Sequence, residues 1–294
     1  MTGRMEGKVS FITGAGRGQG RAHAVKQASE GADIIAIDIC ADIPSVPYPM
    51  ASWDDLQETK RLVEKAGRRC VAVKADVRDR NQLRAALDEG LAELGRLTTV
   101  CANAGVLPLA MGEPEPLDFQ DAVDVDLIGV MNTVAVTVPH LLPHGRGASI
   151  IITGSTAAQQ PHSFSSDPRQ IMGPGGSGYG WAKTTLISYI EHMAMHLAPH
   201  GVRVNGVHPT NCSTHLMHNQ GIYSVFRPDM EAGSVGEDDF AVAACHYHAV
   251  PEPWIQPDEV ADLVLYLGSD ESRSVTAENI RIDLGVVVKG LPSR

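Results

Sequence analysis

Short apolar runs alternate with longer helical patterns along almost the whole chain, and this alternation constrains the fold more than any other feature. The predicted strands are Val9–Thr13, Asp33–Asp38, Cys70–Ala75, Thr98–Ala102, Ser149–Thr153, Val202–Val207 and Asn279–Ile282. The predicted helices are Gly18–Glu30, Ser52–Ala66, Asn81–Leu94, Leu117–Leu142, Tyr179–Ala198 and Asp258–Leu267. Strands that are apolar throughout favour a parallel sheet with both faces covered. We therefore expect an α/β fold, a single Rossmann-type, doubly wound parallel sheet over residues 1–294 with helices on both faces.

Charge and composition narrow the classes of partner. The formal net charge is −11, whereas nucleic-acid binding takes a basic face, so we expect no nucleic-acid partner. The five cysteines form no CxxC pair and fit no zinc template, which predicts reduced thiols, no metal site and a cytoplasmic protein. Met1–Lys8 does not resemble a signal peptide. No apolar run approaches the roughly 18 residues of a membrane span.

Three stretches interrupt the alternation of strands and helices. Ile39–Ala51 carries three prolines, Gln159–Ser177 is rich in Gly, Pro and Ser, and Thr210–Gln256 is long and mixed. Long loops inside a compact domain are usually functional or disordered. The first stretch follows the carboxyl end of a strand, where open α/β sheets bind ligands.

A glycine-rich turn joins the first predicted strand to the first predicted helix. Such a turn lets the backbone approach a pyrophosphate, while the helix N-terminus offers free N–H groups to the phosphates. Tight turns of ordinary βα units also use glycine, so the flanking strand and helix strengthen the interpretation. The predicted cofactor contacts of this turn are Gly14, Arg17, Gly18, Gln19 and Gly20.

Asp38 ends the second predicted strand, about 20 residues past the glycines, as in dinucleotide-binding folds. Its carboxylate can accept both ribose hydroxyls of an adenosine and would repel a 2′-phosphate. The position therefore predicts NAD rather than NADP. Two alternatives stay open: a solvated turn aspartate, and a 2′-phosphate bound by Arg17.

Two further turns lie at the ends of strands. Asp76 and Val77 follow the third strand and are predicted to contact the adenine. Asn103, Ala104 and Gly105 follow the fourth strand and let the backbone pass close to the cofactor. Either turn alone is also compatible with ordinary turn chemistry.

Tyr179 and Lys183 stand at positions i and i+4 of a predicted helix, so their side chains share one face. A phenol with a pKa of about 10 is a poor base at neutral pH, but a nearby ammonium favours the phenolate. This pairing suits acid–base chemistry on an alcohol, although an exposed aromatic–lysine pair would look the same. Ser155, beyond the fifth strand, is the predicted hydroxyl partner, with Thr153 and Thr156 as rivals.

Taken together, these pieces resemble the short-chain dehydrogenase/reductase family over nearly the whole chain. The matching residues are Thr13–Gly20, Asp38, Asp76, Asn103–Gly105, Ser155, Tyr179 and Lys183. The resemblance implies a Ser–Tyr–Lys triad, hydride transfer to or from a nicotinamide, and a homotetramer. It also implies cofactor contacts at Tyr179, Lys183, Pro209 and Thr210, and a substrate lid over 210–256.

A narrower resemblance is to the carveol-dehydrogenase-like subfamily, which includes mycofactocin-coupled members. It is carried by GRGQGRAHAV at 16–25, DIIAIDIC at 33–40, ADVRD at 75–79, VHPTNCSTHLM at 207–217 and the 39–51 insertion. In that subfamily the inserted loop covers the NAD. The resemblance therefore implies a non-exchangeable NAD that a separate redox carrier reoxidises.

Two positions depart from the family pattern. Asp126 stands where the family usually has an asparagine that helps to hold a proton-relay water, so we expect Asp126 at the site, paired with Lys183 or shifting its pKa. Ser155 and Tyr179 are separated by about twice the usual spacing. The extra residues, roughly Ser163–Gly175, predict an excursion at the site mouth.

The sequence predicts an NAD-dependent alcohol dehydrogenase or carbonyl reductase. The apolar lid residues favour a cyclic secondary alcohol of terpenoid or steroid type; they are Leu216, Met217, Ile222, Tyr223, Val225, Phe226 and Trp254. The same fold could serve a non-catalytic NAD-binding regulator, or an epimerase or dehydratase of the extended family. His215 and His218 lack matching metal ligands, so we expect lid or surface histidines there, with His215 a candidate substrate contact.

Overall fold

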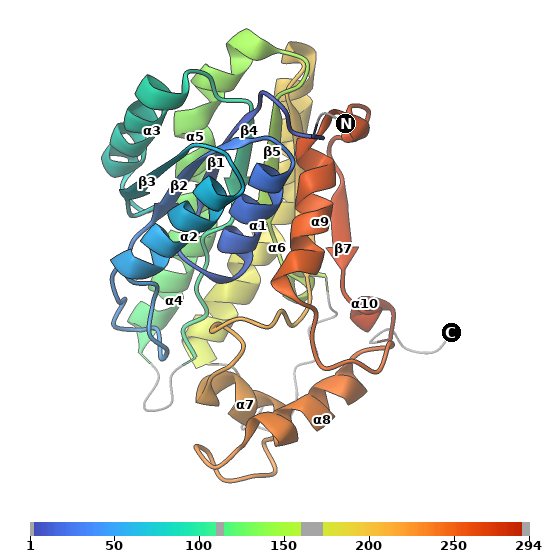
Figure 1. The fold of residues 1–294 in the computed structure, drawn as a ribbon. Coiled ribbons are helices and arrows are strands. Elements are labelled where there is room, and N and C mark those ends of the chain that lie inside the picture. The colour runs from blue at the N-terminus through green and yellow to red at the C-terminus, as the bar shows by residue number, and fades with distance from the viewer. Residues whose placement is uncertain (1–2, 110–114, 160–172, 290–294) are drawn as a thin grey trace.

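A parallel sheet organises the chain. The computed structural model describes residues 3–109, 115–159 and 173–289, and within them seven strands pair in the order β3-β2-β1-β4-β5-β6-β7. Their bounds are β1 Val9–Thr13, β2 Asp33–Asp38, β3 Cys70–Lys74, β4 Thr99–Ala102, β5 Ser149–Thr153, β6 Arg203–Pro209 and β7 Asn279–Ile282. All neighbouring strands are parallel, so their carboxyl ends meet at one edge. The predicted fold class is confirmed (Figure 1).

One face of the sheet is covered by α1 (Gly18–Ser29), α2 (Trp53–Lys65) and α9 (Pro257–Gly268). Buried strand residues such as Ile12, Ile34 and Ile151 pack there against Leu56 and Val264. Ser52 caps the N-terminus of α2, because its hydroxyl accepts the Asp55 N–H at 3.1 Å. The short apolar side chains of α1 let this helix lie close to the sheet.

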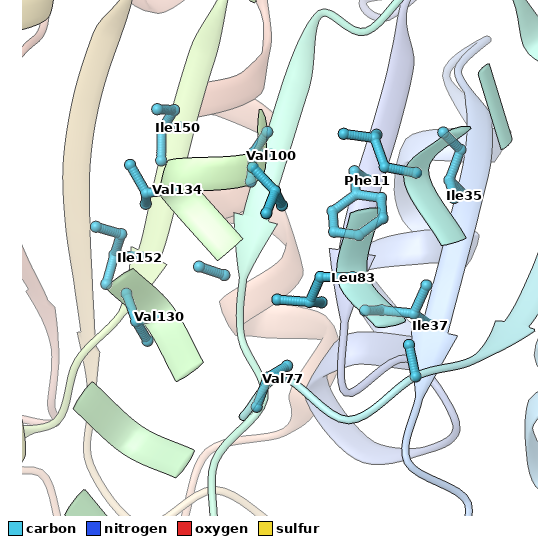
Figure 2. Close-up of a cluster of buried hydrophobic side chains, with 14 of the residues drawn as sticks. Phe11, Ile35, Ile37, Val77, Leu83, Val100, Val130, Val134, Ile150 and Ile152 are labelled. Carbon is cyan, nitrogen blue, oxygen red and sulfur yellow. The ribbon is translucent and has the colours of Figure 1, made fainter. Parts of the chain in front are cut away.

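The other face is covered by α3 (Arg80–Leu94), α5 (Val130–Leu141) and α6 (Gly173–Leu197). Figure 2 shows this core, in which Phe11 and Ile35 of the sheet lie beside Leu83 of α3, and Ile150 lies beside Val134 of α5. Because successive strand residues point to opposite faces, β1 supplies Phe11 to this core and Ile12 to the other.

The predicted helix Leu117–Leu142 is one continuous helical stretch whose middle is widened. It consists of α4 (Pro116–Val123), a π-helical segment η1 (Asp124–Gly129), α5 and a short 3₁₀ turn. By length and composition alone, Pro116–His144 could cross a membrane, which differs from the sequence expectation of no such span. Since 61% of its most apolar window is buried and α4 packs on α6, we interpret it as a core helix.

The structure corrects two parts of the predicted layout. The stretch 210–256 contains α7 (Gln220–Phe226) and α8 (Glu237–Tyr247), which the sequence pattern did not predict, and both lie beneath the carboxyl edge of the sheet (Figure 1). Helix α6 begins at Gly173 rather than Tyr179, so residues 173–177 belong to a helix and not to the Gly/Pro/Ser loop. The expected excursion of 163–175 otherwise lies outside the described residues.

Two glycines inside helices give a matched test of core packing. A methyl group at Gly90 of α3 would lie 2.5 Å from Ile35 Cδ1, whereas one at Gly180 of α6 would meet no atom within 4 Å. We expect Gly90→Ala to lower the free energy of unfolding by about 1–3 kcal/mol through overpacking. Gly180→Ala should raise it by up to about 1 kcal/mol. Urea unfolding measures both, and equal effects would contradict the described core.

Candidate active site

A cavity of about 290 Å³ opens at the carboxyl edge of the sheet, and every residue predicted to be catalytic or cofactor-binding lines it. The lining includes Gly14, Arg17, Gly18, Gln19, Gly20, Asp38, Asp76, Val77, Asn103, Ala104, Gly105, Asp126, Ser155, Tyr179, Lys183, Pro209 and Thr210. The turns after six neighbouring strands supply most of these residues. Their convergence follows from parallel pairing, which brings the carboxyl ends of all strands to one edge.

The glycine-rich turn after β1 is built for close backbone approach. Gly14 has a positive φ of 66°, and a methyl group on Gly20 would lie 2.1 Å from the Gly14 carbonyl oxygen. The N-cap residue of α1, Arg17, makes no side-chain capping hydrogen bond. The first-turn N–H groups of α1 are therefore oriented as donors for an anion in the cavity.

Asp38 lies at the end of β2 with its carboxylate beside this turn. Oδ2 accepts the Gly16 N–H at 2.9 Å and Oδ1 accepts the Cys40 N–H at 3.2 Å. Burial raises the pKa of Asp38, and these backbone donors and Arg17 oppose that rise. The side chain is 8% exposed, which excludes the alternative of a freely solvated turn aspartate.

The 39–51 insertion is fastened over the cavity. The Tyr48 hydroxyl accepts the Leu107 N–H at 3.2 Å, and the Ser45 hydroxyl donates to Asp121 Oδ2 at 2.7 Å. The Arg17 guanidinium donates to the Pro49 carbonyl, so the side chain that could have met a 2′-phosphate already holds this loop. Val46 and Tyr48 are buried in the core of the α3 face.

The remaining strand-end residues are held by neighbours. Arg78 binds the Asp76 carboxylate through Nη2 at 2.7 Å, so this carboxylate is already paired. The Asn103 amide donates to the Thr13 carbonyl at 3.0 Å, and its Oδ1 accepts the Thr153 hydroxyl at 3.2 Å. Thr153 is thereby engaged away from the reaction centre, which favours Ser155 over this rival.

Tyr179, Lys183 and Ser155 lie together at one wall of the cavity. Lys183 Nζ lies 5.5 Å from the Tyr179 ring centroid, and the Ser155 side chain, close to the Tyr179 phenol, acts to lower the pKa of that phenol. Lys183 Nζ donates to the Thr153 carbonyl at 3.0 Å and forms an ion pair with Asp126 Oδ1 at 3.0 Å. Asp126, expected from sequence to pair with Lys183, does so.

This cluster is almost closed to solvent, with Lys183 2% and Asp126 0% exposed. Burial raises the pKa of Tyr179; the Lys183 ammonium lowers it and the Asp126 carboxylate raises it again, leaving it above its usual value. Burial lowers the pKa of Lys183, but Asp126 and Tyr179 together raise it by more than burial lowers it. The pKa of Lys183 is therefore above its usual value, and the ammonium is retained. The expected lowering of the Tyr179 pKa by Lys183 is thus outweighed by burial and by Asp126.

Sequence reasoning missed two residues that shape the site. Tyr48 lines the cavity from the insertion. His208 of β6 lies behind Ser155, with Nδ1 at 3.2 Å from the Ser155 N–H and Nε2 at 2.8 Å from Asn279 Oδ1. The sequence signal for Tyr48 is an aromatic residue in a proline-rich loop, and the signal for His208 is a histidine inside a buried strand.

The stretch 210–256 contributes a mostly apolar wall. Its cavity-lining side chains include Leu216, Met217, Ile222, Val225, Phe226 and Tyr247, with Thr214 and His215 beside the glycine-rich turn. Tyr223 and Trp254, which the sequence analysis grouped with the apolar lid residues, stack on Phe240 within the stretch 210–256. His218 hydrogen-bonds with the Ser213 hydroxyl at 2.9 Å and with the Tyr223 hydroxyl at 3.2 Å. His215 lines the cavity, and burial together with the charge of Arg17 lowers its pKa.

Comparison with known proteins gives one family and several full-length relatives. The family model described as enoyl-(acyl carrier protein) reductase, of the short-chain dehydrogenase type, matches residues 14–287. A putative short-chain type dehydrogenase/reductase of Mycolicibacterium smegmatis is 42% identical over 98% of this chain and 100% of its own. A (−)-trans-carveol dehydrogenase of Rhodococcus erythropolis is 38% identical over 97% of this chain and 99% of its own.

Among solved structures, carveol dehydrogenase from Mycobacterium avium in complex with NAD superposes with a TM-score of 0.88. It is 42% identical and covers 98% of this chain and 100% of its own. The resemblance inferred from sequence motifs is therefore confirmed at both levels, the family and the carveol-dehydrogenase-like relatives.

The space behind Gly105 tests the buried pair. A methyl group at Gly105 would lie 2.6 Å from Asp126 Oδ1 and 3.5 Å from Lys183 Nζ. We expect Gly105→Ala to lower the free energy of unfolding by about 1–3 kcal/mol, because the ion pair cannot move without losing its contacts. Urea unfolding measures the loss, with Gly180→Ala as the matched control. No loss would mean that the pair does not occupy this space.

Proposed function

The chain belongs to the short-chain dehydrogenase/reductase family, and from that premise we propose that it is an NAD-dependent oxidoreductase interconverting a secondary alcohol and its ketone. The observation that carries this proposal is one cavity lined at once by the glycine-rich turn, Asp38 and the Ser155–Tyr179–Lys183 cluster. A cofactor site and an acid–base pair therefore meet in the same space.

The residues fit a dinucleotide. The contact between Gly14 and Gly20 leaves room only for backbone, and the uncapped N-terminus of α1 supplies donors for a pyrophosphate. Asp38 would accept ribose hydroxyls and disfavour a 2′-phosphate, while Arg17 already has a carbonyl partner. We therefore propose NAD over NADP, with adenine beside Asp76 and Val77. When bound, the nicotinamide supplies the hydride chemistry at its C4 atom.

In the proposed mechanism, Tyr179 moves the proton. Its phenol gives a proton to the ketone oxygen in reduction and takes one from the hydroxyl in oxidation. Ser155, anchored by the Ala157 N–H at 3.1 Å, orients the substrate oxygen toward the phenol. Lys183 keeps its charge in the buried site and stabilises the phenolate as the proton leaves.

The substrate class follows from the wall that faces this cluster. Leu107, Leu216 and Met217 contribute hydrocarbon to the lining of the cavity that also contains Ser155 and Tyr179. An apolar cyclic secondary alcohol, terpenoid or steroid in type, would bury its rings there and present one hydroxyl. The carveol dehydrogenases among the relatives have names that agree with this class.

We also propose that NAD does not exchange freely and that a separate redox carrier, as in mycofactocin-coupled enzymes, reoxidises it. The support is the fastening of the 39–51 loop by Arg17, Ser45 and Tyr48. A dinucleotide beneath this loop can leave only if these contacts open.

The assembly and location remain part of the proposal. The exposed apolar side chains of α4 and α6, Leu117, Phe119 and Trp181, support a homotetramer that covers this face. The five cysteines are all free thiols, which supports a reducing, cytoplasmic setting. Residues 1–294 are proposed to act as one domain, with 210–256 as its substrate lid.

Replacing Tyr179 by phenylalanine removes only the phenol oxygen. We expect Tyr179→Phe to lower kcat/KM by about 10²–10⁴-fold while leaving folding and NAD binding intact. A screen of cyclic secondary alcohols, starting with carveol, with an artificial electron acceptor or free NAD supplies the assay. Turnover within a few-fold of wild type would reject the assignment. If the wild type folds and binds NAD but turns over no alcohol in the screen, the alternative of a non-catalytic NAD-binding regulator is favoured.

Loosening the 39–51 loop away from the cavity tests cofactor retention. Ser45→Ala with Val46→Ala removes one hydrogen bond and part of a buried side chain, and neither residue lines the cavity. We expect bound NAD to be lost about tenfold faster, as followed by native mass spectrometry during dialysis.

The matched control for this experiment is Ser29→Ala with Val242→Ala, both on exposed surface. It should retain NAD like the wild type. Loss of NAD from the wild type on simple dialysis, or equal retention in both double variants, would count against non-exchangeable NAD.

A further inference from the structure

We propose that Asp126 is a positioning residue: its carboxylate holds and neutralises the Lys183 ammonium. As a result, Tyr179 becomes the phenolate that can take the proton of an alcohol only at higher pH than it would if residue 126 were uncharged. The proposal rests on the proposed function, because it concerns the pH at which Tyr179 acts as the base. Its consequence is an enzyme whose phenol keeps its proton at neutral pH, so that alcohol oxidation requires a higher pH than it would without the Asp126 charge.

Both carboxylate oxygens of Asp126 have partners in the structure. Oδ1 lies 3.0 Å from Lys183 Nζ, and Oδ2 accepts the Val106 N–H at 3.2 Å. The side chain is fully buried, and Gly105 leaves the space in which the carboxylate lies. Asp126 touches neither the Tyr179 hydroxyl nor Ser155 through any contact described above, so its influence on the phenol passes through Lys183 and through its own field.

The local backbone explains why an aspartate can reach this point. Asp126 lies in the π-helical segment η1, and such widened turns often occur at functional sites. Asp124, in the same segment, is only partly buried, and its nearest described partner is the Gln120 amide at 3.5 Å. The two carboxylates thus differ in environment although they are two residues apart.

Charge counting gives the direction of the effect. With Asp126 ionised, the buried cluster of carboxylate, ammonium and phenol is neutral, and losing a proton leaves it negative. With an asparagine, the cluster starts at one positive charge and becomes neutral on losing the proton. Burial disfavours net charge, so the proton leaves at lower pH without Asp126, whether Tyr179 or Lys183 gives it up.

The other titratable groups that face the cluster do not replace this carboxylate. Tyr48 faces it from the insertion, and burial raises the pKa of this phenol, keeping it neutral. His208 faces it from β6, and burial followed by the Lys183 charge lowers its pKa, so its ring is neutral at neutral pH. Arg17 acts on the Tyr48 phenol, and its guanidinium donates to the Pro49 carbonyl. Within the described residues, the net charge around Tyr179 is therefore decided by Asp126 and Lys183.

The test compares the pH dependence of kcat/KM for alcohol oxidation in wild type, Asp126→Asn and the control Asp124→Asn, with carveol or the best alcohol of the screen. Asp126→Asn keeps the size and the acceptor for Val106 but removes the charge. We expect its acid-side limb to move down by about one to two pH units. Asp124→Asn should follow the wild-type profile. An acid limb of Asp126→Asn that is unchanged, or moved to higher pH, overturns the proposal.

A second variant and a second measurement guard against misfolding. Asp126→Ser removes the same charge with a smaller side chain and carries the same expectation. Ultraviolet difference absorbance of tyrosinate follows ionisation without turnover; it should appear at lower pH in Asp126→Asn, and the added signal should vanish in Asp126→Asn with Tyr179→Phe.

The two hypotheses fail in different ways. If Tyr179→Phe retains turnover, the proposed function fails. If Tyr179→Phe is inactive while Asp126→Asn keeps the wild-type acid limb and tyrosinate titration, only the role of Asp126 is overturned.

Discussion

Parallel pairing of the strands is the constraint on which the rest of this structure depends. Because every neighbour in the sheet is parallel, each strand delivers its following turn to the same edge. The glycine-rich turn after β1, Asp38 after β2 and Ser155 after β5 are far apart in sequence yet line one cavity. Helices on both faces bury β1, β2, β4, β5 and β6 over their whole length, so the turns that follow them start from fixed positions.

The chemistry of the site depends on the balance of charge among the buried side chains of Lys183, Asp126 and Tyr179. Lys183 cannot remain charged at 2% exposure without partners, and the Thr153 carbonyl and Asp126 carboxylate supply them. The same carboxylate opposes the influence of Lys183 on Tyr179. Stabilising the lysine and activating the tyrosine are therefore competing demands, and the residue at position 126 decides between them.

On the cofactor side of the cavity, the glycine-rich turn is contacted by two loops. Arg17 follows the glycines at a place where it could have met a phosphate, but its guanidinium binds the Pro49 carbonyl of the insertion. Thr214, from the stretch after β6, lies against Gly18 from the other side. Two loops that are distant in sequence thus contact the same glycine-rich turn.

The sequence by itself predicted the sheet, the glycine-rich turn and the Tyr179–Lys183 pair, because strand and helix periodicities and i, i+4 spacing are local properties that burial preserves. It also predicted that Asp126 would meet Lys183. Only the tertiary structure decided what these groups do to one another. Whether Asp38 is solvated, whether Arg17 faces a phosphate or a loop, and whether Tyr223 and Trp254 contact substrate or Phe240 depend on long-range packing. The pKa of Tyr179 is the clearest case, since burial and the opposing charges of Lys183 and Asp126 exist only once the chain has folded.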